Sequence, residues 1–309
     1  MEEIAPGVHQ LDTLLGGMEQ LTAGFLVTGP RPALVETGAR TSAAAVEAAL
    51  TAAGMGRDDL RWVVVTHIHL DHAGAVGDVA AAYPRAQVVV HPQGARHLVD
   101  PSRLVASAAR VYGPLLDGLY GRMLPVPQER IVAAEDGLTL DVGAGRRLRI
   151  VDSPGHAKHH VAVLEEGTGT LLTGDAVGVR LPGAGPLRPA TPPPDFDLEL
   201  AVASLRRFRA LAPTRLVLTH YGPVEDAGGT LAEAEEELRR WVGVVESVTR
   251  ADPGAGVEEA AGALAAAFAA PAPAGGPADR RLEILNGIHS NAAGILRYLA
   301  GRAEKRGAE

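Results

Sequence analysis

Hydrophobic and polar positions up to about residue 228 alternate between short apolar runs and longer amphipathic stretches. The apolar runs are rich in valine and are bounded by glycine, proline or aspartate, as in buried strands. Between them lie Ala-rich stretches with helical spacing, such as residues 42–54 and 74–83. This alternation predicts helices packed on β-sheet. The predicted strands are Phe25–Thr28, Ala33–Glu36, Trp62–Thr66, Gln87–His91, Leu138–Val142, Leu148–Val151, Val161–Leu164, Thr170–Thr173 and Leu216–Thr219.

Two segments depart from this alternation. Residues 94–130 contain few β-branched runs, and we expect them to be mostly helical and to form an insertion over one edge of the sheet. Residues 178–194 are rich in proline and glycine, which predicts a loop.

The pattern changes to helix alone after about Gly229. Apolar positions at helical spacing predict three helices: one over Leu231–Val248, one over Val257–Ala270 and one over Leu282–Leu299. A Pro/Gly/Ala linker, residues 271–277, separates the last two. The sequence therefore predicts a catalytic domain of residues 1–228, followed by a helical extension of residues 229–309.

The composition narrows the possible chemistry. The 309 residues include no cysteine, which excludes disulfide frameworks, Cys zinc fingers, Cys-ligated iron–sulfur clusters and a catalytic thiol. Any bound metal must therefore be held by histidine, aspartate, glutamate or backbone oxygen.

The charge and the apolar runs indicate the partners and the compartment. A formal net charge of −8 disfavours non-specific binding to nucleic acid or to anionic membranes. No apolar run reaches the roughly 18 residues of a membrane-spanning helix, and the segment MEEIAPGVHQ lacks the apolar stretch of a secretory signal. We expect a cytoplasmic protein that acts on a small-molecule substrate. Its C-terminal helices either cover an apolar sheet edge or form a homodimer contact.

The strongest chemical signal is residues 66–72, with the sequence THIHLDH, directly after a predicted buried strand. In a turn past a strand end, alternate side chains can point toward one ion. His67 and His69 would then face one ion. Asp71 and His72 would face another. Because the chain has only 11 histidines in 309 residues, a chance cluster of this kind in a polar loop is the weaker interpretation.

Three further candidate ligands follow predicted strands later in the chain: His156, Asp175 and His220. Imidazole suits zinc, iron, nickel and copper, and a carboxylate can bridge two ions. Each match is weak by itself, but together and in this order they favour a metal centre.

Through these residues the sequence resembles the metallo-β-lactamase superfamily. Residues 66–72 correspond to that family's H-x-H-x-D-H motif, and His156, Asp175 and His220 fall where its later ligands are expected. The resemblance covers about residues 8–225. It implies an α/β fold, an αββα sandwich of two mixed sheets with helices outside, and a site at the edge of the sandwich.

The resemblance also implies a ligand set and a reaction. In it, His67, His69 and His156 hold the first metal, Asp71, His72 and His220 hold the second, and Asp175 bridges them. Two close dications lower the pKa of a shared water and stabilise an attacked oxygen. The implied enzyme is a hydrolase that uses a bridging hydroxide on an ester-like bond, with Asp71 as the catalytic residue beside the water. The implied cofactors are two zinc ions, with iron or manganese as alternatives.

Some branches of the superfamily fit less well than others. Branches with a Cys ligand are excluded, and the flavin-linked di-iron proteins have Glu where this chain has His69. Quorum-lactone hydrolases place a tyrosine where this chain has Gly178. The complete ligand set and the short interval from Asp175 to His220 are similar to the glyoxalase II group, which implies a thioester substrate.

Several alternatives stay open. Persulfide dioxygenases share the motif but bind one iron through residues that match His67, His156 and Asp175, so the motif does not define the number of ions. A lactonase, a nuclease or a metal-binding protein without catalysis are further alternatives. The gap from the motif to His156 is longer than in ordinary glyoxalase II because of residues 94–130. We expect this segment to cover the site, so the substrate need not be a glutathione thioester.

Other residues are candidates for substrate contact. Tyr221 adjoins the last predicted ligand and has an apolar ring with a hydroxyl that can form hydrogen bonds. Lys158 and Arg180 lie near ligand loops, where a cation could bind an anionic group, although most such charges are only solvated. Tyr112 and Tyr120, in the segment of residues 94–130, are further candidates to line the site.

Overall fold

The computed structural model describes residues 1–268 and 277–307. Contacts within the chain divide it into two compact units, and each unit is made of three stretches of sequence. The first unit contains Met1–Asp152, His159–Gly174 and Pro213–Glu225, and the second contains Ser153–Lys158, Asp175–Ala212 and Asp226–Glu309. The catalytic domain of residues 1–228 stays a prediction, because this division follows contacts and not chain order.

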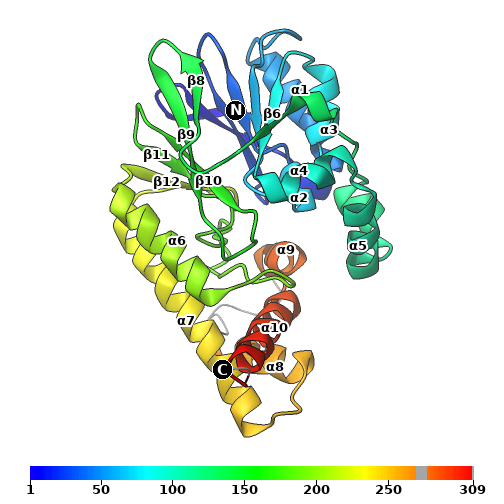
Figure 1. The fold of residues 1–309 in the computed structure, drawn as a ribbon, viewed down its shortest axis with the longest axis vertical. Helices are drawn as coiled ribbons and strands as arrows, with labels where there is room; N and C mark the ends of the chain where they lie inside the picture. The colour runs from blue at the N-terminus through cyan, green and yellow to red at the C-terminus, as the bar shows by residue number, and fades with distance from the viewer. Residues whose placement is uncertain (269–276, 308–309) are drawn as a thin grey trace. The chain divides into compact units, whose positions relative to one another are not determined.

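Two mixed β-sheets form the first unit (Figure 1). The first sheet has seven strands in sequence order, antiparallel from β1 to β4 and parallel from β4 to β7. Parallel neighbours need crossover connections, which the helices of this unit supply. The strands are β1 (Glu2–Ala5), β2 (Val8–Asp12), β3 (Ala23–Val27), β4 (Ala33–Val35), β5 (Trp62–Val64), β6 (Gln87–Val90) and β7 (Ile131–Ala133).

The second sheet has six strands in the order β13-β12-β11-β10-β9-β8. Only β11 and β12 are parallel, and the other neighbours are antiparallel. Its strands are β8 (Thr139–Gly143), β9 (Arg146–Asp152), β10 (Val161–Glu165), β11 (Thr170–Leu172), β12 (Arg215–Leu218) and β13 (Gly222–Val224). The sequence pattern had missed β1, β2, β7 and β13, which are short or rich in polar residues.

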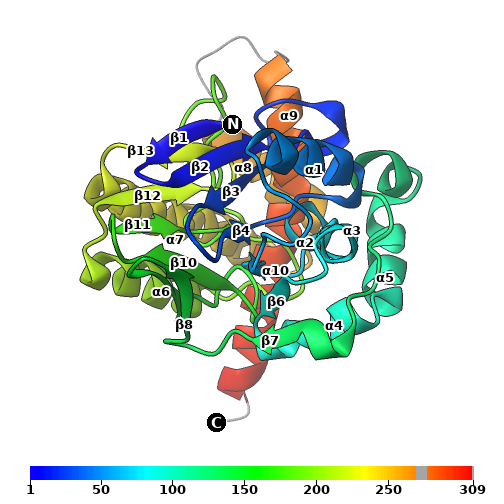
Figure 2. The same cartoon turned by 90° about the horizontal axis from the view of Figure 1, so that it is seen from above.

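The two sheets pack face to face through one apolar core (Figure 2). Phe25, Val64 and Val89 enter this core from the first sheet, and Ile150 and Val163 enter it from the second. All are buried, because alternate side chains of a strand point to the same face. The predicted pair of face-to-face mixed sheets is confirmed.

Helices of the first unit follow the parallel strands. Helix α1 contacts β2 and α3, and α3 contacts β6, so these helices lie against the first sheet. Residues 94–130, expected to be mostly helical, contain most of α4, all of α5, a π-helical turn η3 and a 3-10 turn η4. The elements are η1 (Leu15–Gly17), η2 (Arg40–Ser42), α1 (Ala43–Ala52), α2 (Leu70–Ala73), α3 (Val76–Ala82), α4 (Pro92–Val99), α5 (Ser102–Tyr112), η3 (Leu116–Tyr120) and η4 (Gln128–Arg130).

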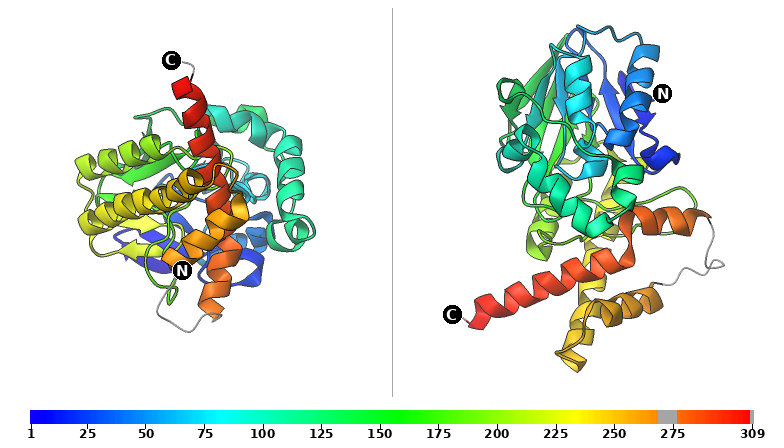
Figure 3. Two further views of the ribbon diagram at one scale, coloured as in Figure 1. Left: turned by 90° about the horizontal axis from the view of Figure 1, so that it is seen from below. Right: turned by 90° about the vertical axis from the view of Figure 1, so that its right-hand side faces the viewer.

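The second unit is helical. Helix α6 contacts α7, and α7 and α8 both contact α10 (Figure 3). The predicted loop of residues 178–194 is fully described and has no helix or strand, only a bridge between Val179 and Arg188. None of the described helices is both long and apolar enough to cross a membrane. The helices are α6 (Leu198–Leu211), α7 (Ala227–Ala251), α8 (Val257–Ala267), α9 (Pro277–Asn286) and α10 (Ile288–Gly307).

The single helix predicted over Leu282–Leu299 is wrong, because the chain forms two helices with Gly287 between them. The first N–H groups of a helix need acceptors, and the Glu283 carboxylate accepts from the Ile288 N–H at 3.1 Å. Glycine is also a poor helix former. The apolar spacing continues across the break, so periodicity did not reveal it. Most of the predicted linker, residues 271–276, and the predicted helix end at Ala270 lie outside the described residues.

Candidate metal centre

Five of the seven predicted ligands lie in the first unit, at the ends of strands from both sheets. His67 follows β5, His69 precedes α2, Asp71 and His72 lie in α2, and His220 follows β12. One ligand atom from each of Asp71, His72 and His220 lies within 4.8 Å of the others. The two sheets therefore bring together residues that are about 150 positions apart in the chain.

The rings of His72 and His220 face each other with their Nε2 atoms 3.1 Å apart. On its other side, His220 Nδ1 lies 2.7 Å from the carbonyl oxygen of Leu21. His72 Nδ1 lies 3.2 Å from the Glu36 carboxylate. A carbonyl oxygen can only accept a hydrogen bond, so in His220 Nδ1 carries the proton.

The Nε2 lone pair of His220 therefore faces His72 Nε2, and the side chains of His72 and His220 are 0% and 1% exposed. The Asp71 carboxylate adds negative charge, 3.7 Å from His72 Nε2 and 3.6 Å from His220 Nε2. This arrangement of ring nitrogens around a carboxylate suits a metal cation. A neutral imidazole with its Nε2 lone pair exposed to the site is a common metal ligand.

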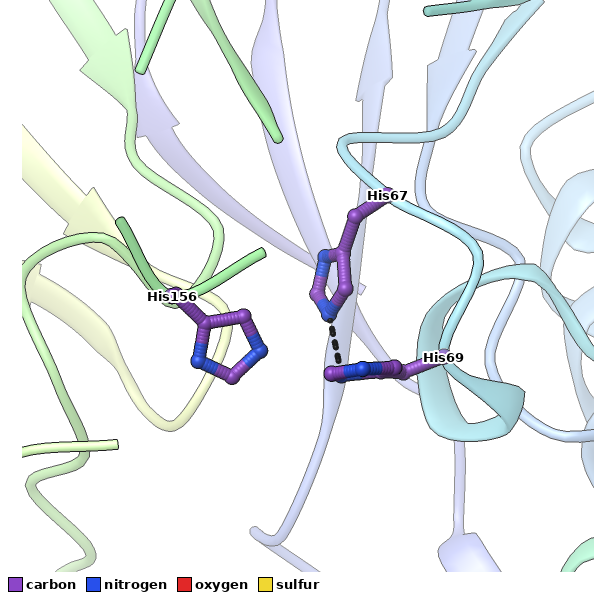
Figure 4. Close-up of side chains that lie close together, drawn as sticks. All are labelled: His67, His69 and His156. Carbon is purple, nitrogen blue, oxygen red and sulfur yellow. Dashed lines mark hydrogen bonds between the residues drawn. The ribbon is translucent and has the colours of Figure 1, made fainter. Parts of the chain in front are cut away.

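The ring of His67 also has a buried oxygen partner, the hydroxyl of Thr66, which links it to the Glu36 carboxylate. The Thr66 hydroxyl donates to Glu36 Oε1 at 2.5 Å. A hydroxyl has one proton, so Thr66 can only accept from His67 Nδ1, which lies 3.0 Å away. His67 Nε2 is then unprotonated and lies 2.9 Å from His69 Nδ1 (Figure 4).

Glu36 is the residue of this site that the sequence analysis missed. Its side chain is 1% exposed, and it serves both His72 and, through Thr66, His67. Strand β4 ends at Val35 and not at Glu36 as predicted, because Glu36 adopts a left-handed backbone conformation with φ +66°. Such a conformation costs about 1–2 kcal/mol for a non-glycine residue. The available signal was an acidic residue directly after a buried strand, which by itself indicates only a strand end.

A glycine is required at position 174, because the backbone there passes close to Thr66 and His160. A Cβ atom there would lie 2.5 Å from His160 Nε2 and 2.7 Å from Thr66 Oγ1. The backbone at Gly174 also has φ +52°, which L side chains rarely adopt. A side chain at this position would displace Thr66 and, with it, the partner of His67.

The other two predicted ligands, His156 and Asp175, lie together in the second unit. His156 Nδ1 lies 3.0 Å from the carbonyl oxygen of Ala190, so it too carries the proton. His156 Nε2 faces Asp175 Oδ2 at 3.5 Å, and both residues are buried. This pairing of a ring nitrogen with a carboxylate suits a metal cation. Figure 4 labels His156 as well.

The donor chemistry of both groups fits a divalent metal. Three histidines (His67, His156 and His220) share one arrangement: an oxygen acceptor lies at Nδ1, and Nε2 faces another candidate ligand. Metal-binding histidines usually have such a partner, which sets the tautomer and orients the ring. Nitrogen and carboxylate oxygen ligands suit zinc, iron and manganese.

The predicted substrate residues all have partners within their own units. Lys158 pairs with Asp195 at 3.1 Å and its side chain is 64% exposed, and Arg180 pairs with a glutamate of α7. Tyr221 packs against the core between the sheets. Burial, with the nearby Asp12 carboxylate, raises the pKa of Tyr221 to about 12. Their contact with a substrate stays a prediction.

Comparison with known proteins identifies the family. Residues 17–220, more than half of the chain, match the family model described as the metallo-beta-lactamase superfamily. The chain belongs to this superfamily, and the αββα fold class predicted from the sequence is confirmed. Members typically bind divalent metal ions, and membership supports a metal-dependent hydrolase type of enzyme.

Individual relatives extend over different parts of the chain. The metallo-beta-lactamase fold-containing protein ST1585 of Sulfurisphaera tokodaii is 32% identical over 170 residues, which cover 54% of this chain and 62% of that protein. A hydroxyacylglutathione hydrolase of Alkalilimnicola ehrlichii is 31% identical over 176 residues, 57% of this chain and 52% of that protein. The chain thus spans less than two thirds of either relative.

A solved structure supports the fold over almost the whole chain. The metallo-beta-lactamase family protein TTHA1429 from Thermus thermophilus matches with a TM-score of 0.71 and 22% identity, over 97% of this chain and 95% of that one. At this identity the likeness concerns the fold, and the substrate has to be argued from the site.

Proposed function

We propose that this protein is a metal-dependent hydrolase that cleaves an ester-like bond in a small molecule, with a thioester as the first candidate. The observation that carries the proposal is the group of Asp71, His72 and His220, in which one ligand atom from each residue lies within 4.8 Å of the others. Imidazole nitrogens and a carboxylate oxygen are donor atoms of a zinc site.

The proposed centre holds two zinc ions. In this assignment His67, His69 and His156 would hold one ion, and Asp71, His72 and His220 would hold the other. Asp175 would be a ligand shared by both. The shared tautomer of His67, His156 and His220 supports the assignment, because each presents the nitrogen that a metal needs. The buried His156–Asp175 pair supports the inclusion of these two residues.

The side chains of the chain have separate tasks in the proposed reaction. Bound divalent ions supply positive charge that activates a water molecule and stabilises the attacked oxygen. Asp71 is less buried than the neighbouring histidines, with a side chain 15% exposed, so its carboxylate can accept a hydrogen bond from the attacking water and orient it. Glu36 holds His72 directly and His67 through Thr66, so that both rings keep their orientation.

The thioester is supported by the similarity to a hydroxyacylglutathione hydrolase, whose name denotes cleavage of a thioester. The acyl part of such a substrate carries the carbonyl that a water attacks. Lys158 and Arg180 remain proposed contacts for an anionic group on the substrate, and Tyr221 for a polar one.

The test measures the metal content of the protein and its turnover of candidate substrates. Chelator-free, untagged protein is analysed by elemental mass spectrometry and then assayed on ester, thioester, lactone and phosphodiester substrates. We expect about two zinc ions per chain, in line with a two-metal hydrolase site, and thioester cleavage that a chelator abolishes and zinc restores. One iron per chain with oxygen uptake on a persulfide would contradict the proposal and support a mono-iron dioxygenase.

A further inference from the structure

Helices α4 and α5 are neighbours in the first unit (Figure 1), and a groove lies between them and residues 122–125. Its volume is about 540 Å³, which falls in the range of small-molecule sites, roughly 300–1,000 Å³. The seven candidate metal ligands are not part of its described lining. Most of the lining is apolar and comes from Val99, Pro101, Val105, Ala106, Met123 and Pro125.

The two walls of the groove are held by backbone contacts. The Val126 N–H, directly after the groove, donates to the carbonyl of Leu98 in α4 at 2.8 Å. Both residues are buried. The same segment packs against α3, where the carbonyl of Leu124 leaves no room for a Cβ at Gly77. The groove therefore exists before any ligand binds, so binding does not have to order the chain.

Three polar residues complete the lining: Asp100, Ser102 and Arg122. The Asp100 carboxylate accepts the backbone N–H of Ser102 at 3.1 Å, so its charge lies at the N-terminus of α5, where it is favourable. The Arg122 guanidinium pairs with Asp117 at 2.8 Å, and these side chains are 59% and 65% exposed. Because Asp117 is outside the lining and an exposed ion pair contributes little, a ligand can replace Asp117 as the partner of Arg122.

The apolar face of α5 continues beyond the groove. Val105, which lines the groove, shares one face of the helix with Ala109 and Tyr112, four and seven positions further on. The ring of Tyr112 packs on the ring of Tyr120 with the centroids 4.6 Å apart, and Tyr112 stays 36% exposed. An extended hydrocarbon chain therefore finds apolar contacts along α5.

The charges around the groove favour an anionic ligand. Residues 94–125 contain four arginines and two aspartates, although the net charge of the whole chain is −8. Helix α5 carries Arg103 and Arg110 and no acidic residue, so pairing with α5 of a second copy would bring like charges together. The described walls are helices and a loop, so they offer no strand edge for a peptide. An apolar chain with one anionic group matches this lining.

We propose that the groove binds a fatty-acid anion, with its hydrocarbon chain along α5 and its carboxylate on Arg122. The inference goes beyond the proposed hydrolase function and does not depend on it. In the bound state the carboxylate takes the place of Asp117, so Asp117 competes with the ligand for Arg122. This competition predicts effects of opposite sign at the two residues.

The test measures the Kd of decanoate for the zinc-loaded protein by calorimetry, below the concentration at which decanoate forms micelles. Ala106→Phe places a ring in the groove at an exposed position, so the fold should persist. Ser107→Phe is the matched control, because it adds the same ring at the exposed neighbouring position outside the lining. Arg122→Gln and Asp117→Asn change the ion pair, and Arg110→Gln, outside the lining, is their control.

We expect decanoate to bind at least about tenfold more tightly than hexanoate, because each buried methylene contributes up to about fourfold. Ala106→Phe should weaken decanoate binding by at least about tenfold, since it takes the place of several methylenes. Arg122→Gln should weaken binding by up to about fivefold, as for the loss of an exposed ion pair. Asp117→Asn should tighten it by a similar factor. Ser107→Phe and Arg110→Gln should match the wild type.

A carboxylate can also bind to zinc, but binding at the metal centre would not respond to Ala106→Phe or Asp117→Asn. Equal Kd values for these variants and the wild type would therefore overturn the inference, and so would equal Kd values for hexanoate and decanoate. An effect of Ser107→Phe as large as that of Ala106→Phe would also contradict it.

Vesicles of phosphatidylglycerol distinguish the groove from a membrane-binding face. If the wild type does not bind decanoate, the inference is wrong. If it binds the vesicles instead, and Ala106→Phe abolishes that binding, the same face contacts a lipid surface. The hydrolase proposal is unaffected by all of these outcomes, because it is tested by zinc content and turnover.

Discussion

Two buried polar clusters in this molecule differ in how their hydrogen-bond donors and acceptors are matched. In the second unit, the Asn291 amide donates to Asn286 Oδ1 at 2.6 Å and its oxygen accepts from the Thr191 N–H at 2.6 Å. Asn286 in turn donates to the carbonyl of Pro189 at 2.9 Å. Each of these donors meets an acceptor, so the cluster is complete and joins α9 and α10 to the loop before α6.

In the histidine cluster of the first unit, ring nitrogens and a carboxylate lie against one another. The inner nitrogens of His72 and His220 face each other and the Asp71 carboxylate. Imidazole nitrogens gathered around a carboxylate suit a metal ion. The comparison teaches that amide groups which pair donor with acceptor stabilise a fold, whereas buried imidazole and carboxylate groups gathered together mark a candidate ligand site.

Loss of Asp175 should have the largest effect on zinc content and turnover. Asp175→Ala takes away the proposed bridge between the two ions, so we expect lower zinc content and a loss of turnover greater than the roughly 10²–10³-fold caused by losing one hydrogen-bond donor. Elemental mass spectrometry and thioester assays measure both. Asp58→Ala, which removes an exposed partner of Arg85, is the control. A variant with both ions and full activity would show that the ligand assignment is wrong.

Glu36→Gln should have the next largest effect, because it keeps the shape of the side chain and removes the charge that holds His72. We expect zinc affinity to fall by about 10–100-fold, as when other partners of metal-binding histidines are lost. Competition with a chromophoric chelator measures the affinity. Glu165→Gln changes another fully buried carboxylate of the same unit and should leave the affinity unchanged. Equal affinity in both variants would remove Glu36 from the site.

Asn291→Ala should lower the stability of the protein and leave its zinc affinity unchanged, which is the reverse of what we expect for the two metal-site variants. It leaves the Thr191 N–H and Asn286 Oδ1 without their Asn291 partner, so we expect a decrease of about 1–3 kcal/mol in the free energy of unfolding. Urea denaturation of the zinc-loaded protein measures this, and zinc affinity should not change. Ser290→Ala, at the exposed neighbouring position, is the control. A loss of zinc without a loss of stability would contradict the distinction between the clusters.

Lys158→Ala should have the smallest effect. The exposed pair of Lys158 with Asp195 contributes little to stability. If the lysine binds an anionic substrate group, KM rises by up to about fivefold, which corresponds to the roughly 1 kcal/mol of an exposed ion pair. Steady-state kinetics on a charged and an uncharged thioester measure the effect, with Arg85→Ala as the control. An unchanged KM on the charged substrate would remove Lys158 from the substrate site.

Much of the fold could be predicted from local patterns in the sequence. Trp62–Val64 and Val161–Glu165 are short apolar runs between turn residues, and both are strands. The edge strand β1 (Glu2–Ala5) was missed because its side chains are mostly exposed and polar, so no apolar run marks it. The break at Gly287 was missed because its cause, a capping Glu283 carboxylate, does not alter the apolar spacing.

The sequence by itself determined the donor atoms of the candidate metal centre. His67, His69, Asp71 and His72 are close in the chain, and their spacing after a strand is a local property. Only the tertiary structure decided which nitrogen of each ring is turned inward. It did so through Glu36, Leu21 and Thr66, whose contacts depend on how the strands of two sheets align.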